Sequence, residues 1–382
     1  MDVWRVELDI LAETLRNIEK SGNLRRLPDP VDTEAGNGLL NLSSNDYLGL
    51  ASDKDLRRDF LERLTVDDFK PSSSSSRLLT GNSSEYLELE NLLAQLYGTE
   101  SALVFNSGYH MNIGILPAIA QAQTLILSDN LIHASLIDGI RLARAEFQRY
   151  RHNDCDHLEE LIEKEHHRYR QIIVVTESIF SMDGDEANLV RLGEIKARYR
   201  NVMLYVDEAH AVGVRGVNGL GLAEELGCLA EIDILAGTFG KALASVGGFI
   251  VCGKVLCEYL VNTMRPLIFT TGLPPINLRW THHVLSRLGD YHDKRRRLAE
   301  TGRFLHQRLA DKGFHGASPS HIQPIILGES HVAVAKAAEM REHGFHVLPV
   351  RPPTVPAGTS RLRISLTADV DVADVERIVD CL

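Results

Sequence analysis

Cysteine is scarce in this chain of 382 residues, and its spacing excludes two common uses of the residue. The five cysteines are an odd number, and no two of them form a Cys-x-x-Cys pair. A disulfide-stabilised secreted fold and a zinc ribbon both depend on paired, closely spaced cysteines, so neither is expected. This usage is typical of a protein from a reducing compartment such as the cytosol.

Long hydrophobic runs are also missing. The longest stretch without a charged side chain extends from Ser101 to Ser128, and polar residues and a proline interrupt it. A membrane-spanning helix needs about 20 consecutive apolar residues, so no such span is expected. The first five residues, Met-Asp-Val-Trp-Arg, lack the order of a signal peptide, in which basic residues precede an apolar segment. We therefore expect a cytoplasmic protein.

An excess of positive charge is absent as well. The chain has 41 Lys and Arg against 52 Asp and Glu, and its formal net charge is −11. Nucleic-acid backbones and anionic lipid surfaces attract clustered basic residues, so a general nucleic-acid or membrane-surface role is disfavoured. A local cationic pocket for a small anionic molecule is compatible with this balance.

The sequence does contain an alternation of short apolar runs with amphipathic segments. Helical patterns lie between the runs, for example over residues 85–97, where leucines recur at helical spacing. This alternation predicts an α/β fold with a mostly parallel central sheet and helices on both faces. The expected strands are residues 103–105, 125–127, 172–176, 203–206, 232–236 and 249–252.

Three regions follow from the same patterns. Residues 1–40 combine a short helical pattern with a Pro- and Gly-containing stretch, and we interpret them as an N-terminal arm. Residues 41–285 hold the strand and helix alternation and are expected to form a large domain. Residues 286–382 are expected to form a smaller α+β domain. Its segment 361–366, Arg-Leu-Arg-Ile-Ser-Leu, alternates polar and apolar residues, which predicts a half-buried antiparallel strand.

The segment Asp207-Glu208-Ala209-His210 follows an apolar run, and ligands of open α/β sheets bind at the carboxyl ends of strands. Asp-Glu-Ala-His is also the Walker B sequence of DEAH-type nucleotide triphosphatases. Such an enzyme needs a phosphate-binding loop with the pattern G-x-x-x-x-G-K-[ST], which this chain lacks. The closest segment, residues 237–242, has a different glycine spacing and no hydroxyl after its lysine. The triphosphatase interpretation is therefore disfavoured.

Asp207 and Lys241 together favour a different chemistry. Lys241 follows an expected strand within Gly-Thr-Phe-Gly-Lys, with no carboxylate nearby in sequence. A lysine held there in a low-polarity site has a lowered pKa, and its neutral amine can form a Schiff base with an aldehyde. A buried aspartate keeps a pyridinium nitrogen protonated and makes the ring an electron sink. The alternative is that Lys241 is an ordinary solvated residue of a Gly-rich turn.

Two further segments support this chemistry. Asn106-Ser107-Gly108-Tyr109-His110 lies between an expected strand and an expected helix, where glycine permits close backbone approach and free N–H groups can bind a phosphate. His133, after another apolar run, has an imidazole that can stack on an aromatic ring. Taken alone, a histidine in such a position more often has a structural role in the core or on the surface.

These segments occur as an ordered set, and together they closely resemble the α-oxoamine synthases of the fold-type I pyridoxal-phosphate enzymes. The resemblance extends from about residue 20 to the end of the chain. The segments that carry it are residues 43–50 (Ser-Ser-Asn-Asp-Tyr-Leu-Gly-Leu), 106–109, 133–135, 176–185 (Thr-Glu-Ser-Ile-Phe-Ser-Met-Asp-Gly-Asp), 207–210 and 238–242.

The resemblance implies roles for individual residues. Lys241 would hold the cofactor as a Schiff base and later abstract the α-proton of an amino acid, and Asp207 would pair with the pyridinium nitrogen. His210 would bond the phenolic oxygen, and His133 would stack on the ring next to the substrate. The remaining cofactor contacts would come from Gly108, Tyr109, Ser181 and Thr238, and the substrate carboxylate would be bound by Arg363 with help from Asn45. No metal is implied.

Within the family, residues 351–363 resemble the branch that joins L-alanine to a pimeloyl thioester, carried by CoA or by acyl-carrier protein, in biotin biosynthesis. Arg25 and Thr354 would then contact the acyl substrate. Glycine-using relatives, 2-amino-3-ketobutyrate CoA ligase and 5-aminolevulinate synthase, share the cofactor residues and are the alternative. A catalytically silent binding protein on the same fold would be expected to have lost Lys241 or Asp207, and both are present.

Family members are homodimers with active sites at the subunit interface, so residues 72–76, Thr270 and Thr271 would act on the partner's phosphate. The sequence departs from the family pattern at two places. Residues 72–76 are all serine where many relatives have a Gly-Ser-Gly loop. Ala244 replaces a frequent glycine, which is tolerated unless the backbone there has a positive φ.

Overall fold

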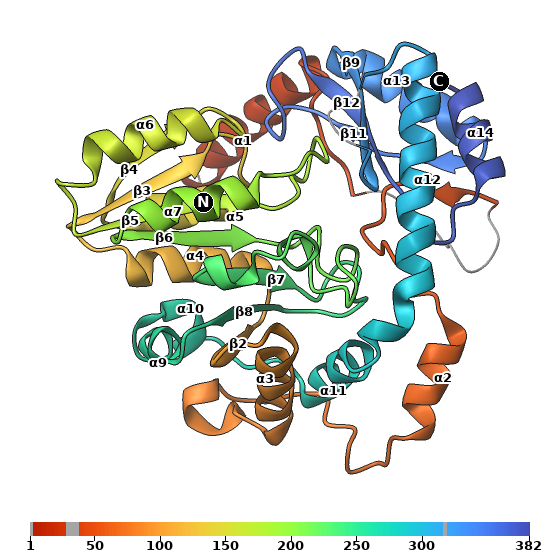
Figure 1. The fold of residues 1–382 in the computed structure, drawn as a ribbon. Coiled ribbons are helices and arrows are strands. Elements are labelled where there is room, and N and C mark those ends of the chain that lie inside the picture. Colours follow the sequence, from red (N-terminus) through yellow and green to blue (C-terminus); the bar gives the residue numbers. More distant parts are fainter. Residues whose placement is uncertain (1–2, 28–37, 316–318) are drawn as a thin grey trace. The chain divides into compact units, whose positions relative to one another are not determined.

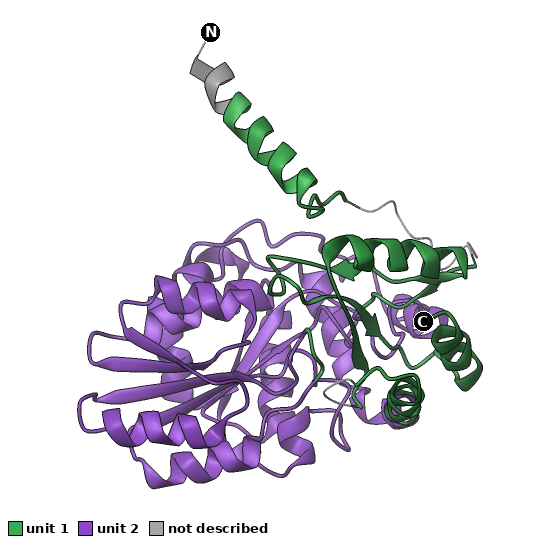
Figure 2. Cartoon of the chain, turned by 90° about the horizontal axis from the view of Figure 1, so that it is seen from above, with its two compact units in different colours: residues 1–44, 182–184, 299–382 green, residues 45–181, 185–298 purple. Residues whose placement is uncertain are grey.

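A computed structural model describes residues 3–27, 38–315 and 319–382 and divides the chain into two compact units (Figure 2). Unit 1 comprises Met1–Ser44, Met182–Gly184 and Ala299–Leu382, and unit 2 comprises Asn45–Ser181 and Asp185–Leu298. Residues 28–37, which belong to the expected N-terminal arm, lie outside the described residues. The division into an arm and two domains at residues 41 and 286 stays a prediction.

Unit 2 is built on a seven-stranded sheet with the strand order β2-β8-β7-β6-β5-β3-β4. Neighbouring strands from β7 to β4 pair in parallel, whereas β8 is antiparallel to both β7 and β2. The strands are β2 (Ser101–Phe105), β3 (Thr124–Asp129), β4 (Glu146–Tyr150), β5 (Gln171–Glu177), β6 (Val202–Asp207), β7 (Ile234–Thr238) and β8 (Gly248–Cys252).

Helices lie on both faces of this sheet (Figures 1 and 2), which confirms the predicted α/β fold with a mostly parallel sheet. The helices of unit 2 are α2 (Lys54–Glu62), α3 (Ser84–Tyr97), α4 (Gly108–Ile119), α5 (Ala134–Leu142), α6 (Cys155–Glu165), α7 (Leu189–Arg198), α8 (Leu222–Glu225), α9 (Lys254–Thr263), α10 (Arg265–Ile268) and α11 (Pro275–Leu285), with the short helical segments η1 (Arg77–Gly81), η2 (Leu229–Glu231) and η3 (Leu288–Tyr291).

The six expected strands are all present, and their predicted bounds differ from the observed ones by only a few residues. β7 begins at Ile234 rather than at residue 232, and it continues to Thr238. The seventh strand, β4, was missed because its sequence, Glu-Phe-Gln-Arg-Tyr, is mainly polar. β4 is an edge strand in which only Tyr150 is buried, so no apolar run marks it. By contrast, every residue of the interior strand β3 is buried.

Unit 1 contains an antiparallel sheet with the order β11-β12-β9 and a parallel pair, β1-β10. Helix α12 begins in unit 2, and its residues from Ala299 onward belong to unit 1. The elements are α1 (Val3–Lys20), β1 (Leu40–Asn41), α12 (His292–Asp311), β9 (Ile322–Gly328), α13 (Ser330–Glu342), β10 (Phe345–His346), β11 (Pro349–Val350), β12 (Ser360–Ser365) and α14 (Val372–Asp380).

Strand β12 is antiparallel, as predicted, but it is not half-buried. All six of its residues are buried. Its polar side chains find hydrogen-bond partners inside unit 1: Arg361 donates to Asp183, and Arg363 donates to the Oγ of Ser365 at 2.5 Å. Because these polar groups are satisfied by protein, the alternation of polar and apolar residues does not mark an exposed face here.

No helix within the described residues is long and apolar enough to cross a membrane. All five cysteines are reduced, although the Sγ atoms of Cys252 and Cys257 lie 3.2 Å apart.

Candidate active site

Three neighbouring strands of unit 2 end in functional groups at one edge of the sheet. β5 ends at Glu177, β6 at Asp207 and β7 at Thr238. In the parallel register Glu177 lies beside Asp207, and Asp207 lies beside Ala236. The carboxyl ends of parallel strands meet at the same edge, which is where open α/β sheets bind ligands.

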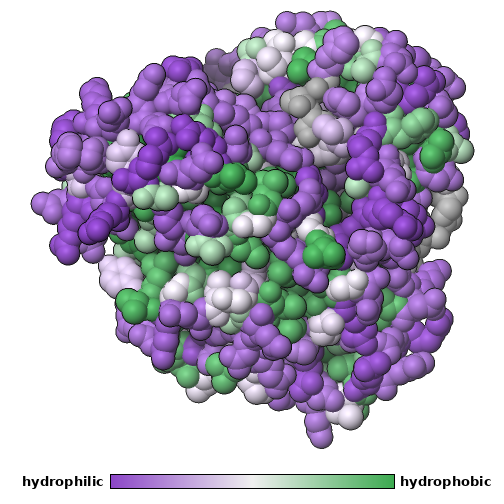
Figure 3. Space-filling model, viewed as in Figure 1, coloured by the Kyte–Doolittle hydropathy of each residue, from purple (hydrophilic) through white to green (hydrophobic). Residues whose placement is uncertain are grey.

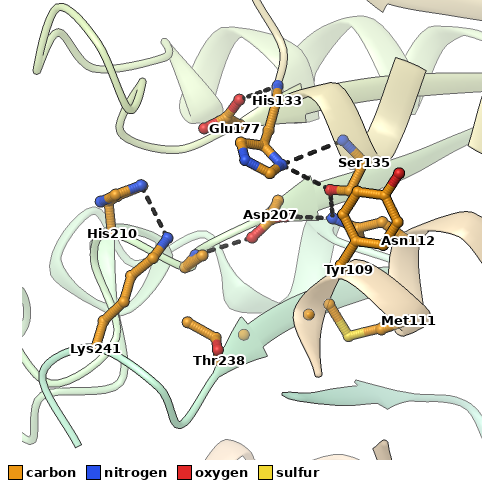
Figure 4. A pocket seen from close by; sticks show the side chains of 13 residues that line it. Tyr109, Met111, Asn112, His133, Ser135, Glu177, Asp207, His210, Thr238 and Lys241 are labelled. Carbon is orange, nitrogen blue, oxygen red and sulfur yellow. Dashed lines mark hydrogen bonds between the residues drawn. The ribbon is translucent and has the colours of Figure 1, made fainter. Parts of the chain in front are cut away.

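A cavity of about 160 Å³ opens at this edge of unit 2 (Figure 4). The segments after the strands and the first turns of α4 and α5 contribute its walls. The cavity is lined by Gly108, Tyr109, Met111, Asn112, His133, Ser135, Glu177, Asp207, Ala209, His210, Gly237, Thr238 and Lys241. Seven residues assigned to the cofactor from the sequence are therefore brought together: Gly108, Tyr109, His133, Asp207, His210, Thr238 and Lys241.

The imidazole of His210 lies between Lys241 and Tyr47. The Lys241 Nζ is 2.8 Å from Nε2 of His210, and the Tyr47 hydroxyl is 2.6 Å from its Nδ1. That hydroxyl also donates to Oδ1 of Asn45 at 2.9 Å. A hydroxyl has only one proton, so His210 carries its proton on Nδ1 and donates it to Tyr47. The Nε2 of His210 then accepts from the Lys241 amine.

Asp207 is buried and accepts two hydrogen bonds. The side-chain amide of Asn112 donates to its Oδ2 at 2.8 Å, and the backbone N–H of Ala209 donates to its Oδ1 at 2.9 Å. Both donors favour a carboxylate in a fixed orientation. Figure 4 shows Asp207 in the middle of the cavity, between the Lys241–His210 pair and the His133 ring.

His133 is the N-cap of α5, and its Nδ1 accepts the backbone N–H of Ser135 at 3.2 Å. The Ser135 hydroxyl lies 2.7 Å from the same nitrogen. Desolvation by the surrounding protein lowers the pKa of His133; the Asp207 charge opposes this effect and the Lys241 charge adds to it. The ring is therefore a neutral imidazole, and since its Nδ1 accepts a hydrogen bond, its proton is on Nε2.

Glu177 lies in one of the motifs that carry the family resemblance, but the resemblance gives it no role. It is buried, and its Oε1 accepts the backbone N–H of His133. Burial, together with the neighbouring charge of Asp207, raises the pKa of Glu177 to about 8. At neutral pH it is thus mainly a protonated acid on the cavity wall. Its position as the last residue of an apolar strand is the signal that could have identified it.

Asn112, Ser135 and Tyr47 were also missed as parts of the site. Asn112 is the clearest case, because it is an amide in the otherwise apolar helical segment Met-Asn-Ile-Gly-Ile-Leu. A polar side chain on the buried face of a helix requires a partner. Such a residue is therefore recognisable in the sequence, although the partner itself is not.

The first turn of α4 forms one end of the cavity. Ser107 is the N-cap and accepts the backbone N–H of His110 at 3.1 Å. Gly108 lies beside Thr238, and an added Cβ would be at ordinary van der Waals distance, 3.8 Å, from the Thr238 side chain. Thr238 itself accepts the backbone N–H of Gly240 and donates to the carbonyl of Gly247. A helix N-terminus beside a hydroxyl is suited to binding a phosphate.

The remaining predicted residues do not line the cavity. Ser181 is buried in unit 2, and Asn45 accepts a hydrogen bond from the Tyr47 hydroxyl, which in turn contacts His210. Arg25, Thr354 and Arg363 all belong to unit 1. There, the Arg25 guanidinium donates to the Thr354 hydroxyl at 3.0 Å, so the two residues assigned to the acyl substrate are brought together.

The two departures from the family pattern have positive φ angles. Ala244 has φ +48° in the segment after Lys241, and Ser74 has φ +51° in the serine segment 72–76. This segment pairs with the residues around Thr271: Ser76 and Thr271 form a β-bridge, and the Gly272 N–H donates to Ser75 at 2.9 Å. The condition under which Ala244 was expected to be costly is therefore met.

An ionic cluster holds the loop that contains Ser181 through Asp185, which lies four residues after Ser181. His152 lies 2.9 Å from a carboxylate oxygen of Asp129 and 2.8 Å from one of Asp185. Burial alone lowers the pKa of His152, but the hydrogen bonds and charges of the two aspartates outweigh it and raise the pKa to about 10. His152 is therefore a charged imidazolium that holds the ends of two segments together.

The donor set of the cavity fits pyridoxal phosphate. It offers an amine for an aldehyde (Lys241), a buried carboxylate for a ring nitrogen (Asp207), a neutral imidazole (His133) and a helix N-terminus with Thr238 for a phosphate. Among the described residues, no group of three or more His, Cys, Asp or Glu side chains is arranged to hold a metal ion.

Comparison with known proteins agrees with this fit. Residues 37–382 match the family model "Aminotransferase class I and II". A protein of Pasteurella multocida named "Putative 8-amino-7-oxononanoate synthase" is 52% identical over 377 residues, which cover 97% of each chain. A protein of the same name from Haemophilus influenzae (strain 86-028NP) is 50% identical over 380 residues and covers 98% of this chain and 100% of its own.

Several solved structures are similar to this chain over most of its length. The serine palmitoyltransferase of Sphingomonas wittichii has a TM-score of 0.86 and 32% identity, and the match covers 100% of this chain and 97% of that one. A serine palmitoyltransferase solved with pyridoxal phosphate has a TM-score of 0.85 and 30% identity, covering 98% and 96%. The 8-amino-7-oxononanoate synthase of Francisella tularensis has a TM-score of 0.76 and 26% identity, covering 90% and 96%.

Proposed function

Since the chain belongs to the aminotransferase class I and II family and is a pyridoxal-phosphate-dependent, acyl-transferring enzyme, we propose that it condenses L-alanine with a pimeloyl thioester. The products are 8-amino-7-oxononanoate, which is an intermediate of biotin biosynthesis, CO₂ and the free thiol of the acyl carrier. The names of the relatives that are about 50% identical support this choice of substrates.

One observation carries the proposal: Lys241, His210 and Asp207 converge on one cavity, with the Lys241 Nζ 2.8 Å from the His210 Nε2. When bound, pyridoxal phosphate supplies an electron sink that stabilises negative charge next to the substrate amine. Lys241 would hold the cofactor through its Nζ, and the same amine would accept the α-proton of L-alanine. The Nε2 of His210 orients this amine, and Asp207 holds a proton on the ring nitrogen.

The other assignments complete the site. His133, a neutral imidazole, would pack on the cofactor ring. The first turn of α4, together with Ser181 and Thr238, would bind the remaining oxygens of the cofactor. Arg363 binds the substrate carboxylate as a planar fork, together with Asn45. Arg25 and Thr354, already hydrogen-bonded to each other, contact the acyl substrate.

A homodimer is part of the proposal. The hydroxyl-rich segments 72–76 and 270–271 lie side by side in unit 2, and this arrangement supports a shared site for a partner's phosphate. Hydrophobic side chains beside them are exposed, among them Leu79 at 79% and Phe269 at 71%. Hydrophilic residues prevail on the face seen in Figure 3, with hydrophobic residues reaching the surface toward its centre. Exposed apolar surface of this kind favours association. A cytoplasmic location also stays a prediction.

The test is a comparison of substrates with purified holoenzyme. L-Alanine, glycine and L-serine are each combined with pimeloyl-CoA, pimeloyl-acyl-carrier protein and palmitoyl-CoA, and CO₂ and the ketone product are quantified by mass spectrometry. We expect turnover with L-alanine and a pimeloyl carrier, and no turnover in Lys241→Ala.

Two results would contradict the proposal in different ways. Turnover with glycine but not with L-alanine would assign the enzyme to the glycine-using branch. Turnover with L-serine and palmitoyl-CoA would instead give it the activity named for the serine palmitoyltransferases to which it is similar. The comparison of the two pimeloyl carriers also identifies the acyl donor.

A further inference from the structure

Asn112 connects Asp207 with His133, two parts of the site that lie in separate sequence motifs. It lies in the first half of α4, with 2% of its surface exposed, and lines the cavity beside Asp207 (Figure 4). A buried amide without partners is costly, so its contacts indicate what the side chain is for.

Both N–H groups and the oxygen of the Asn112 side chain make hydrogen bonds. Its Nδ2 donates to the Asp207 Oδ2 at 2.8 Å and to the Ser135 Oγ at 2.9 Å, while its Oδ1 accepts the Tyr205 hydroxyl at 2.6 Å. A carboxylate only accepts and Tyr205 has one proton to give, so the amide cannot be reversed. The orientation of Asn112 is thus determined by its neighbours.

The second N–H of Asn112 leads to His133. The Ser135 oxygen accepts from Asn112, so its own proton is available for the His133 Nδ1, 2.7 Å away. The Ser135 backbone N–H also donates to that Nδ1. One direction of donation therefore continues from Asn112 through Ser135 to His133, and it leaves the His133 proton on Nε2.

We propose that Asn112 is a positioning residue that aims Asp207 at the cofactor's ring nitrogen and, through Ser135, holds His133 as its Nε2–H tautomer. The proposal rests on the function proposed above for Asp207 and His133. An amide is suited to this place because it donates twice and carries no charge. A carboxylate here would compete with Asp207 for a proton.

This competition provides the test. In Asn112→Asp the new carboxyl has the shape of the amide but faces Asp207 directly. When the pair holds one proton, the new carboxyl in its protonated form donates to Asp207 as the amide does; when that proton is lost, the two carboxylates repel each other. Cofactor binding by this variant should therefore approach that of the wild type at low pH and weaken as the pH rises.

Other ionisable groups also surround Asp207, and comparison with the wild type controls for their effect on cofactor binding. Glu177 reaches the cavity from β5, His133 from the N-terminus of α5, and His210 and Lys241 from the segments after β6 and β7. Tyr205 lies on β6, and burial raises its pKa well above the ordinary value. These groups are present in both proteins, so the ratio of the two dissociation constants isolates the substituted position.

The experiment measures the dissociation constant of pyridoxal phosphate for apoprotein between pH 5 and 9, by absorbance and by quenching of protein fluorescence. We expect Asn112→Asp to bind within about twofold of the wild type at the acid end and at least about tenfold more weakly at the alkaline end, since one unit of pKa corresponds to a factor of ten. The matched control is Asn201→Asp. Asn201 donates to the carbonyls of His166 and Tyr169 and immediately precedes β6, at the opposite end of this strand from Asp207. Its ratio to the wild type should not change with pH.

A ratio for Asn112→Asp that is independent of pH would overturn the proposal. Should a buried pair of carboxylates prevent folding, Asn112→Ala removes the amide without adding charge. We expect it to weaken cofactor binding about fivefold or more at every pH, and unchanged binding would equally overturn the proposal. No substrate enters these measurements, so a wrong choice of substrates leaves them unaffected. Unchanged binding by Asp207→Ala would instead refute the role of Asp207 on which the proposal rests.

Discussion

Glu177→Gln tests whether a protonated acid is built into the cavity wall. Burial and the neighbouring Asp207 raise the pKa of Glu177 from its ordinary value of 4.5 to about 8. Because of Glu177, the folded protein then binds one more proton than the unfolded chain between these two pH values. The contribution of Glu177 to stability is therefore greatest below its ordinary pKa and is lost as the pH rises through 8. From this pair of pKa values, the free energy of unfolding should fall by about 2 kcal/mol between pH 6 and pH 8 because of Glu177 alone.

Glutamine has the same shape, keeps an oxygen to accept the His133 N–H, and does not titrate. We therefore expect Glu177→Gln to gain about 2 kcal/mol on the wild type between pH 6 and pH 8, which is roughly 4–8 °C in the unfolding midpoint of a unit of this size. The assay is thermal unfolding of apoprotein, followed by circular dichroism over this pH range. Other titrating groups are common to both proteins and cancel in the difference.

The control for this series is Glu88→Gln, which removes the same charge from an exposed position on α3. Its difference from the wild type should stay constant with pH. The reasoning would be refuted if Glu177→Gln also kept a constant difference, because Glu177 would then be ionised in the folded protein throughout this range.

Three further predictions concern other parts of the chain. His152→Asn should lower the unfolding midpoint most below pH 6.5, and the loss should shrink as the pH rises toward the His152 pKa of about 10; a loss that grows with pH in thermal scans would contradict the ionic cluster. Ala244→Gly should raise stability in urea unfolding by about 1 kcal/mol, because an L-residue at φ +48° is strained, and a loss of stability would show that the backbone there is relaxed. Arg25→Ala should raise KM for the acyl thioester about tenfold in steady-state assays and leave KM for L-alanine nearly unchanged, since its guanidinium bonds Thr354, the other residue assigned to the acyl substrate; equal changes in both would argue against that assignment.

Much of the fold could be predicted from local pattern. The interior strands of unit 2 are short apolar runs because both faces of a parallel sheet are covered. A buried strand such as β3 can therefore be recognised in the sequence. Edge strand β4 cannot, because its side chains are mostly exposed and need not be apolar. For β12 the pattern predicts an exposed face that does not exist, because the arginines of this strand are buried and bonded to Asp183 and Ser365.

The candidate site divides along a similar line. Lys241, Asp207 and His210 lie in short motifs at strand ends, and parallel strands bring their carboxyl ends together whatever the rest of the chain does. Asn112 and Glu177 could not be assigned in this way. Their roles depend on which side chain faces them from another element, and that is fixed by sheet register and helix packing rather than by sequence spacing.

The sequence by itself thus determined the family, the cofactor and the strand-end groups, because short contiguous motifs with a fixed local geometry identify each of them. Tertiary structure alone decided the proton positions. The tautomers of His133 and His210, the protonated state of Glu177 and the orientation of Asn112 all follow from hydrogen bonds between residues as much as 163 positions apart in the chain. Burial excludes water as an alternative partner at these atoms, so the neighbouring protein groups determine where each proton lies.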